Sequence, residues 1–220
     1  MTCAEWLTLA AILVALLKEE AQRIWRKPSL IVDFKSEKPF CHKTKYFLRK
    51  DGRTLSDADV YSLRLWVENK GNARAEDVQV FASRLRRKLQ DGGWEEFSYF
   101  FPMNLEWHHG PPGQIVAFAS LNPKMGRYCG LAHVVDPARA KEFDHVHPDA
   151  KVGEAVVALD TEVEPSGGRN TLPPGEYELT IRVGAGNASP HERRLNISWK
   201  GKWLPTVEEM ISQAVGITLQ

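Results

Sequence analysis

The fold class is decided by the stretch Glu176-Tyr177-Glu178-Leu179-Thr180-Ile181-Arg182-Val183, in which apolar and polar residues alternate without a break. Successive side chains of a β-strand point to opposite faces, so this pattern predicts a strand with one face on a core and the other toward water. The stretches 61–68 and 195–199 repeat the alternation. Working outward from these three, we expect a chain made mostly of strands.

Further strands are expected where apolar residues alternate with polar ones less regularly. Turn signals rich in glycine and proline, such as Asp91-Gly92-Gly93 and Pro173-Pro174-Gly175, separate most of them. About eight to ten short strands divided in this way predict an all-β fold, an antiparallel β-sandwich. The expected strands are 30–34, 45–49, 61–68, 78–85, 97–101, 115–121, 128–134, 152–160, 177–183 and 195–199.

Two segments depart from the strand pattern. Residues 122–151 carry three prolines and weak periodicity, so we expect an insertion there with one short strand and one helical turn at 137–143. Near the C-terminus, Thr206 and Glu209 have the spacing of a capping box and precede an apolar stripe, which predicts a short helix over 207–215. The expected organisation is a hydrophobic helix with a charged stalk over 1–27, the sandwich over 28–202 and the C-terminal helix over 203–220.

The first 27 residues differ in character from the rest. An apolar run from Trp6 to Leu17, broken only by Thr8, is followed at once by the charged residues of 18–27. A helix over 2–17 is about 24 Å long, against a hydrocarbon core of about 30 Å, and helical spacing of apolar residues continues beyond Leu17. These features predict a single transmembrane helix. Basic residues follow the apolar run and only Glu5 precedes it, so the globular part is expected in the cytoplasm.

Two other interpretations of this segment stay open. One is an ordinary helix packed on its own domain or on a partner, and the other is a cleavable signal peptide. The signal peptide is the weaker of the two, because Glu5 stands where a basic leader is expected and no small-x-small cleavage pattern precedes Lys18.

Two short motifs resemble a known family. Between Leu65 and Val80, the turn Asn69-Lys70-Gly71 joins two strand-like stretches and resembles the signature of bacterial Ig-like domains of the cell-adhesion-related kind. The stretch from Leu172 to Tyr177 is similar to the approach to the tyrosine corner of fibronectin-type and other Ig-like sandwiches. The resemblance implies an Ig-like fold and brings no functional residue with it, because such sandwiches host unrelated functions. The family is usually extracellular, whereas the charge bias here points inward.

Composition bounds the function. The 29 lysines and arginines nearly balance the 28 aspartates and glutamates, so no nucleic-acid partner is expected from net charge. Three cysteines are too few for a secreted disulfide scaffold and indicate a reducing compartment, although a bridge between Cys41 and Cys129 stays open. The chain has no nucleophile elbow, and Gly184-Ala185-Gly186 is followed by a turn rather than a helix, so we expect neither an enzyme nor a cofactor.

The histidines raise one question of metal binding. His145 and His147 would project from the same side of an extended segment, with Asp144 and Asp149 beside them, which is compatible with a zinc site. A third ligand would have to come from elsewhere, and no paired metal-binding motif supports one. Loop histidines beside a proline are the favoured interpretation, and metal binding stays open.

The remaining candidate site residues are those expected to bind a protein partner. Arg84, Arg86 and Lys88 share one face of an expected strand and form a ridge of positive charge, and Trp66 lies on the polar face of another strand. A solvated strand end that discourages edge-to-edge pairing would explain the same cluster.

We therefore expect a non-catalytic, membrane-tethered binding or scaffolding module that recognises a protein partner. Two alternatives stay open. One is an extracytoplasmic adhesion or envelope domain, which the Ig-like resemblance favours. The other is a metal-dependent enzyme that uses the histidines of the 122–151 segment.

Overall fold

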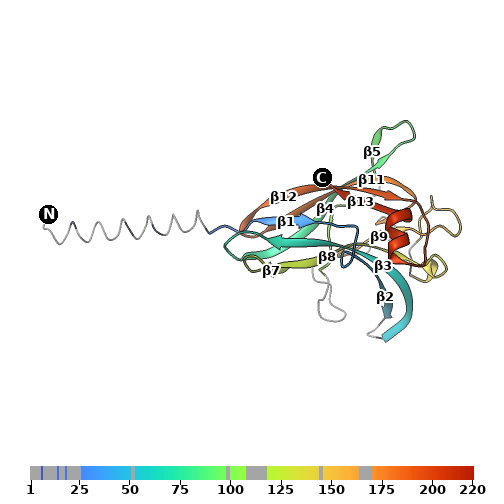
Figure 1. Ribbon diagram of the computed structural model, residues 1–220, viewed down its shortest axis with the longest axis horizontal. Coiled ribbons are helices and arrows are strands. Elements are labelled where there is room, and N and C mark those ends of the chain that lie inside the picture. The colour runs from blue at the N-terminus through green and yellow to red at the C-terminus, as the bar shows by residue number, and fades with distance from the viewer. Residues whose placement is uncertain are drawn as a thin grey trace.

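A computed structural model describes residues 26–50, 53–97, 100–107, 118–143, 146–163 and 170–220, together with Trp6, Val14 and Lys18. In these residues two antiparallel sheets pack face to face (Figure 1). The all-β class and the sandwich-like arrangement expected from the sequence are confirmed.

The first sheet is built around β3, which is 17 residues long. β1 and β2 pair with successive parts of β3 along one side, and β8 pairs with it along the other. β9 and β10 complete the order β1-β3-β8-β9-β10. The strands are β1 (Leu30–Asp33), β2 (Cys41–Lys50), β3 (Arg53–Asn69), β8 (Gly126–Val135), β9 (Val157–Leu159) and β10 (Thr171–Leu172).

The second sheet has the order β13-β12-β11-β4-β5, with β6 and β7 also pairing with β4. The decisive stretch of the sequence lies at its centre, in β11, between β4 and β12. The strands are β4 (Ala75–Lys88), β5 (Trp94–Glu96), β6 (Met103–Asn104), β7 (Ala119–Leu121), β11 (Gly175–Ala185), β12 (Ala188–Trp199) and β13 (Val215–Leu219).

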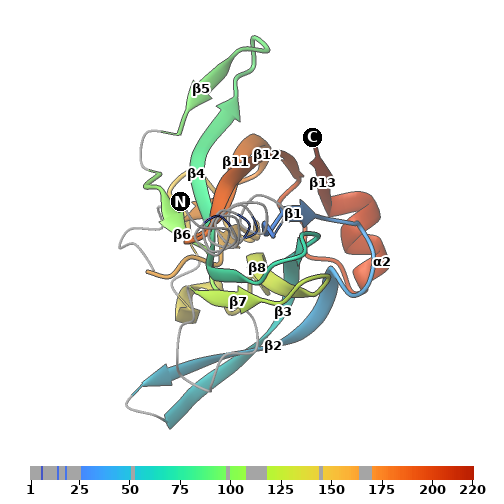
Figure 2. The same ribbon diagram turned by 90° about the vertical axis from the view of Figure 1, so that its left-hand side faces the viewer.

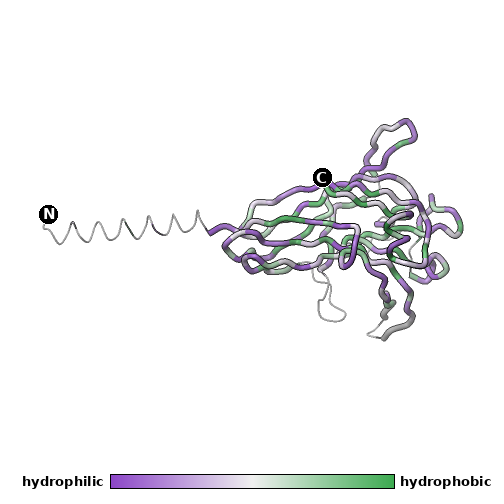
Figure 3. Tube along the Cα trace, in the orientation of Figure 1, coloured by the Kyte–Doolittle hydropathy of each residue, from purple (hydrophilic) through white to green (hydrophobic). Residues whose placement is uncertain are grey.

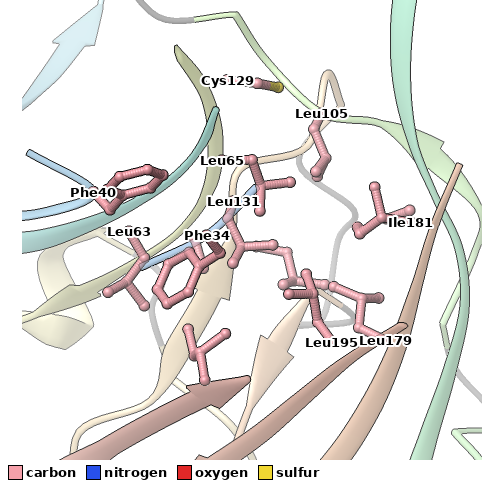
Figure 4. Close-up of a cluster of buried hydrophobic side chains, with 14 of the residues drawn as sticks. Phe34, Phe40, Leu63, Leu65, Leu105, Cys129, Leu131, Leu179, Ile181 and Leu195 are labelled. Atoms are coloured by element: carbon pink, nitrogen blue, oxygen red, sulfur yellow. The ribbon is translucent and has the colours of Figure 1, made fainter. Parts of the chain in front are cut away.

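The core lies between the two sheets, and the alternation along β11 shows how the sequence builds it. Tyr177, Leu179, Ile181 and Val183 are fully buried, whereas Arg182 on the other face is exposed. Leucines of both sheets meet in this interior (Figure 4), and hydrophobic segments run through the middle of the sandwich (Figure 3). Removal of this apolar surface from water is the main force that holds the sheets together.

The Asn-x-Gly turn between β3 and β4 is a structural lock. The Asn69 side chain is completely buried, and its oxygen accepts hydrogen bonds from the backbone N–H groups of Ser29 and Gly71. Its amide nitrogen donates to the carbonyl groups of Ala73 and Leu121. A side chain at Gly71 would lie 2.3 Å from the carbonyl oxygen of Lys27, so only glycine fits at this turn.

The second motif also has a structural role. The Tyr177 hydroxyl donates a hydrogen bond of 2.7 Å to the carbonyl oxygen of Pro173, four residues upstream. This contact ties the start of β11 to the turn before it.

The C-terminal helix forms where its capping box predicts, but the chain does not end there. Thr206 accepts a hydrogen bond from the Glu209 backbone, and the Glu209 carboxylate accepts one from the Thr206 backbone. The helical segments α2 (Val207–Glu209) and η2 (Met210–Ala214) follow. Residues 215–219 then form β13 on the edge of β12, so the C-terminal segment belongs in part to the second sheet.

The expected insertion at 122–151 is not an insertion in its first half. Residues Gly126–Val135 form β8, which pairs with β3 and β9 at the centre of the first sheet. A 3-10 turn, η1 (Ala140–Phe143), follows near the helical turn expected at 137–143.

Two hairpins project from the sandwich at the end opposite to the start of β1. β4 and β5 form one arm, and β2 and β3 form the other, on the opposite side of the body (Figure 1, Figure 2). Residues 26–29 lead into β1 at the other end of the molecule. We call these two ends the distal end and the entry end.

The expected transmembrane helix falls on residues that lie outside the described ones, apart from Trp6, Val14 and Lys18. Within the described part of the chain, no helix has both the length and the apolar character that a membrane span requires.

Candidate functional site

Three of the four predicted binding residues lie together on the outer face of the second sheet. Arg84, Arg86 and Lys88 occupy alternate positions of β4, as expected from the period of a strand. The structure adds what the sequence did not reveal, because each cation is paired with a carboxylate. Arg86 Nε lies 2.9 Å from Glu178, and Lys88 Nζ lies 2.6 Å from Glu176.

The third ion pair of this face, between Arg84 and Glu96, joins the two strands of the β4–β5 arm. Arg84 Nε lies 2.6 Å from a carboxylate oxygen of Glu96 on β5. The ion pair holds the pKa of the Glu96 carboxyl below its usual range and raises the pKa of Arg84. The expected ridge of positive charge is therefore a ladder of alternating charge, which we call the charge ladder: Arg84, Arg86, Lys88, Glu96, Glu176 and Glu178.

Trp94 stands beside this ladder. It lies opposite Lys88 in the β4–β5 arm and is 40% exposed. The Arg86 guanidinium lies 5.6 Å from the centre of its ring, a cation–π distance. A shallow groove of about 280 Å³ runs from Trp94 and Lys88 across Glu176 to Asn196 and Thr218. The face thus combines an exposed aromatic ring with polar groups that are held in place.

Trp66 does not belong to this surface. It lies on β3 in the first sheet, half-buried, with its ring centre 4.8 Å from that of Tyr128. A side chain at Gly126 would lie 2.3 Å from the Trp66 ring, so the indole fills the space above that glycine. Arg64 stacks on the other side of this group, 4.6 Å from the Tyr128 ring. Trp66 is a packing residue in this structure, and the four predicted residues do not form one surface.

The outer face of the first sheet carries a polar cluster that the sequence did not point to. His133 Nδ1 lies 2.5 Å from a carboxylate oxygen of Asp160, and both side chains are nearly buried. Tyr46 stacks on the His133 ring at 4.7 Å, and Ser62 lies opposite His133 on β3. The three residues Ser62, His133 and Asp160 come from β3, β8 and the end of β9. Their sequence spacing carries no signal, because only the pairing of these strands brings them together.

This cluster has the residue types of a nucleophile, a base and an orienting carboxylate, but not their geometry. Such catalysis needs the base within hydrogen-bond reach of the nucleophile. The Ser62 oxygen is buried and makes no hydrogen bond with the described part of the chain, so it is not hydrogen-bonded to the His133 ring. The arrangement therefore acts as a packed polar element of the fold.

The proposed metal ligands are only in part within the described residues. His145 and Asp144 lie outside them. His147 is half-buried beside the Phe97 ring at 6.1 Å, and its Nδ1 accepts a hydrogen bond from the Asp149 backbone. Burial lowers the pKa of His147. Among the residues that the structure describes, no group of three or more histidine, cysteine, aspartate or glutamate side chains could hold a metal ion.

The two described cysteines are free thiols in the core. Cys41 and Cys129 are both buried and do not form the bridge that the sequence left open. Burial raises the pKa of Cys41 to about 12 and raises that of Cys129 as well. Neither thiol is therefore suited to act as a nucleophile near neutral pH.

The comparisons with known proteins assign no family to this chain. No protein-family model matches it, and neither a curated protein nor a solved structure shows significant similarity to it.

Proposed function

We propose that this protein is a non-catalytic binding module, held at a membrane by its N-terminal segment, that recognises a protein partner through the charge ladder and Trp94. The observation that carries the proposal is the exposed Trp94 ring on a projecting arm, beside a shallow groove. Aromatic residues and arginines are enriched in protein interfaces and supply most of their binding energy.

The charge ladder supports this role through its order. Ion pairs with Glu176, Glu178 and Glu96 hold the three basic side chains in fixed positions. Less side-chain freedom is then lost when a partner binds, which favours affinity. Alternating charges also select a partner with the complementary pattern and reject one with a displaced pattern.

The shape of the molecule supports a tethered mode of action. Residues 26–29 enter at one end, and the arm that carries Trp94 projects at the other (Figure 1). A membrane segment before Arg26 would hold the distal end away from the bilayer, where a membrane-resident partner is reached at high effective concentration. Two buried free thiols are consistent with a domain in the reducing cytoplasm.

We also infer that the sandwich is Ig-like. Two observations support this kinship: the hydrogen bond from Tyr177 to Pro173, which is of the tyrosine-corner type, and the buried Asn69 that locks the Asn-x-Gly turn. The bacterial cell-adhesion-related domains are the Ig-like group whose signature the turn resembles. The kinship concerns the fold and adds nothing to the choice of partner.

The test is co-purification of the full-length chain from native membranes, with the captured proteins quantified for the wild type and two variants. We expect Trp94→Ala to lower the yield of a specific partner at least about tenfold, the effect of losing an interface hot spot. The matched control is Met125→Ala, which removes another exposed hydrophobic side chain at the entry end. It should leave the yield within about twofold, since peripheral contacts contribute little. Equal yields for wild type and Trp94→Ala would contradict the proposal.

A further inference from the structure

The entry end holds a hollow that the proposed partner face does not use. It lies between the segment 26–30, which leads into β1, and the turn that joins β11 to β12. Its volume is about 930 Å³, and Arg26, Lys27, Asn187 and His191 are among the residues that line it. We call it the entry hollow.

Both walls of the entry hollow are fixed to the same β3–β4 turn. On one side, Lys27 and Asn72 exchange hydrogen bonds, since the Lys27 N–H donates to the Asn72 side chain and the Asn72 N–H donates to the Lys27 carbonyl. On the other side, the Asn187 side chain accepts from the Glu76 N–H and donates to the Arg74 carbonyl. Because one turn holds both walls, the hollow is formed before any ligand arrives, which lowers the cost of binding.

The lining of the entry hollow is basic. Arg26 and Lys27 are exposed, and neither forms an ion pair with the described part of the chain. Among the described residues that line the hollow, none is an aspartate or a glutamate. The whole chain has a formal net charge of only +1, so this local excess is not a property of the surface in general.

Two buried nitrogen atoms near the hollow have no partner among the described residues. They are Nε2 of His191, which lines the hollow, and Nε of Arg193, two residues further along the same face of β12. A buried polar group without a hydrogen bond costs free energy, and a bound ion or water commonly satisfies it. Because the basic lining favours a negative ligand, an anion is the group that would match the charge of the lining and accept a hydrogen bond from His191.

A peptide strand is a poorer occupant than an anion. β13 covers β12 only from Leu195 onward, so the described residues leave the edge of Ala188–Arg193 open on that side. Pro190 lies in the middle of this edge. Proline has no backbone N–H to donate, and it is a residue with which proteins block the addition of a strand.

More cations surround the entry hollow. Lys70 is tied to it, because its backbone N–H donates to the Ser29 carbonyl. Lys124 donates to the Lys70 carbonyl, and Arg74 carries the carbonyl that binds Asn187. All three side chains are exposed, and the neighbouring acids Glu76 and Asp77 offset only part of their charge. Basic residues that gather next to a membrane segment are attracted to anionic lipid headgroups.

We propose that the entry hollow binds a phosphate group, with Arg26 and Lys27 on the anion and His191 as a hydrogen-bond donor. Arginine and lysine are the residues that recognise phosphate most often in proteins. The phosphate has two sources with the same chemistry, a phospholipid headgroup and free phosphate. The site goes beyond the partner face of the proposed function, and only the choice of the lipid source rests on the membrane tether.

The test uses the full-length chain in neutral detergent micelles. Inorganic phosphate is titrated in one arm and short-chain dihexanoyl phosphatidic acid in the other, with calorimetry for the affinity and backbone amide NMR shifts for the location. We expect saturable binding that shifts the amides of 186–191. Lys27→Gln and His191→Gln should each weaken it about tenfold, the effect of one charge-assisted hydrogen bond. Binding of phosphatidic acid alone identifies a lipid site, and binding of both identifies a general phosphate site.

The matched control is Lys200→Gln, which removes an exposed lysine from outside the lining of the hollow. It should leave the affinity within about twofold, as expected for a distant, screened surface charge. No saturable binding of either probe would overturn the proposal, as would an affinity that Lys27→Gln and His191→Gln do not change. Trp94→Ala should not alter this binding, so the phosphate site and the partner face can fail separately.

Discussion

The two sheets have similar strands but very different outer faces. On the first sheet, the ring of Phe143 from η1 closes over Ala58, Val60 and Val135, and these residues form a second small core. On the second sheet, the corresponding face stays open, and it carries the charge ladder and the exposed Trp94. One outer face is therefore part of the folded interior, and the other is available to a partner.

The difference shows that alternation determines which residues share a face, but not what covers that face. His133 and Glu178 both lie at polar positions of central strands, and both are less than a tenth exposed. His133 is buried beneath Tyr46 and next to Asp160, whereas Glu178 is shielded mainly by its own ion pair with Arg86. Function is expected on the face whose polar groups remain accessible.

The largest effect should come from opening the covered face. Phe143→Ala should lower the free energy of unfolding by about 3 kcal/mol, because it removes a buried aromatic ring and leaves a cavity. Trp94→Ala on the open face should lower it by less than about 0.5 kcal/mol. Urea unfolding of the full-length chain in detergent measures both. Similar losses for the two variants would show that the faces do not differ in this way.

The hydrogen bond between His133 and Asp160 in the first sheet should give the next largest effect. Asp160→Asn should destabilise the fold by about 2 kcal/mol, since it weakens a short hydrogen bond that the nearly buried Asp160 carboxylate accepts from the His133 ring. Asp149→Asn is the control, because Asp149 is 59% exposed and lies 3.5 Å from Arg87. Its effect should be about 0.3 kcal/mol or less. If the two substitutions cost the same in thermal or urea unfolding, the cluster is not a structural element.

The interior that the two sheets share should respond to alkaline pH. Because burial raises the pKa of Cys41 from 9.0 to about 12, its thiol stabilises the fold fully below pH 9, and this contribution is lost as the pH rises toward 12. Between pH 9 and 10 the loss should be about 1 kcal/mol. The free energy of unfolding in urea, measured at pH 9 and at pH 10, tests this loss of stability. Cys41→Ala should flatten the slope, and an unchanged slope in this variant would assign the alkaline loss to other groups such as Cys129 and Tyr177.

The smallest expected effect is a difference in stability between two ion pairs of the charge ladder, Arg86–Glu178 and Arg84–Glu96. Arg86→Met should cost about 1 kcal/mol, because its pair with Glu178 is mostly shielded from water. Arg84→Met should cost less than Arg86→Met, since both members of the Arg84–Glu96 pair are more than half exposed. Unfolding in 0.1 M and 1 M salt sharpens the comparison, as only the exposed pair should be screened. Equal salt sensitivity would mean that the ladder is uniformly solvated.

Much of the fold could be predicted from the sequence. The regular alternation of apolar and polar residues in the sequence predicts β3, β11 and β12. The capping box at Thr206 predicts the start of α2. β13 was missed because it has only five residues and follows η2 directly, so that Val215 was assigned to the helix, and its pairing with β12 is a long-range contact. β8 was predicted as a strand over 128–134, but its place at the centre of the first sheet was missed, because prolines on both sides of it suggested an insertion.

The candidate site was predictable only in part. The shared face of Arg84, Arg86 and Lys88 follows from the period of a strand, so it could be read from the sequence. The acidic partners of these three residues come from β5 and β11. Glu178 is 92 residues from Arg86 in the sequence, so no local pattern indicates that the two side chains are in contact. Trp66 has the same polar-face position as the exposed candidates, and only the fit of its ring over Gly126 shows that it is packed.

The central claim is that the partner meets the open face of the second sheet. The most direct measurement places a photo-crosslinking amino acid in the full-length chain at Trp94 in one strain and at Glu68, on the outer face of β3, in another. After irradiation of intact membranes, the account predicts one specific crosslinked protein from position 94 and none from position 68. A crosslinked partner from position 68 with none from position 94 would contradict it.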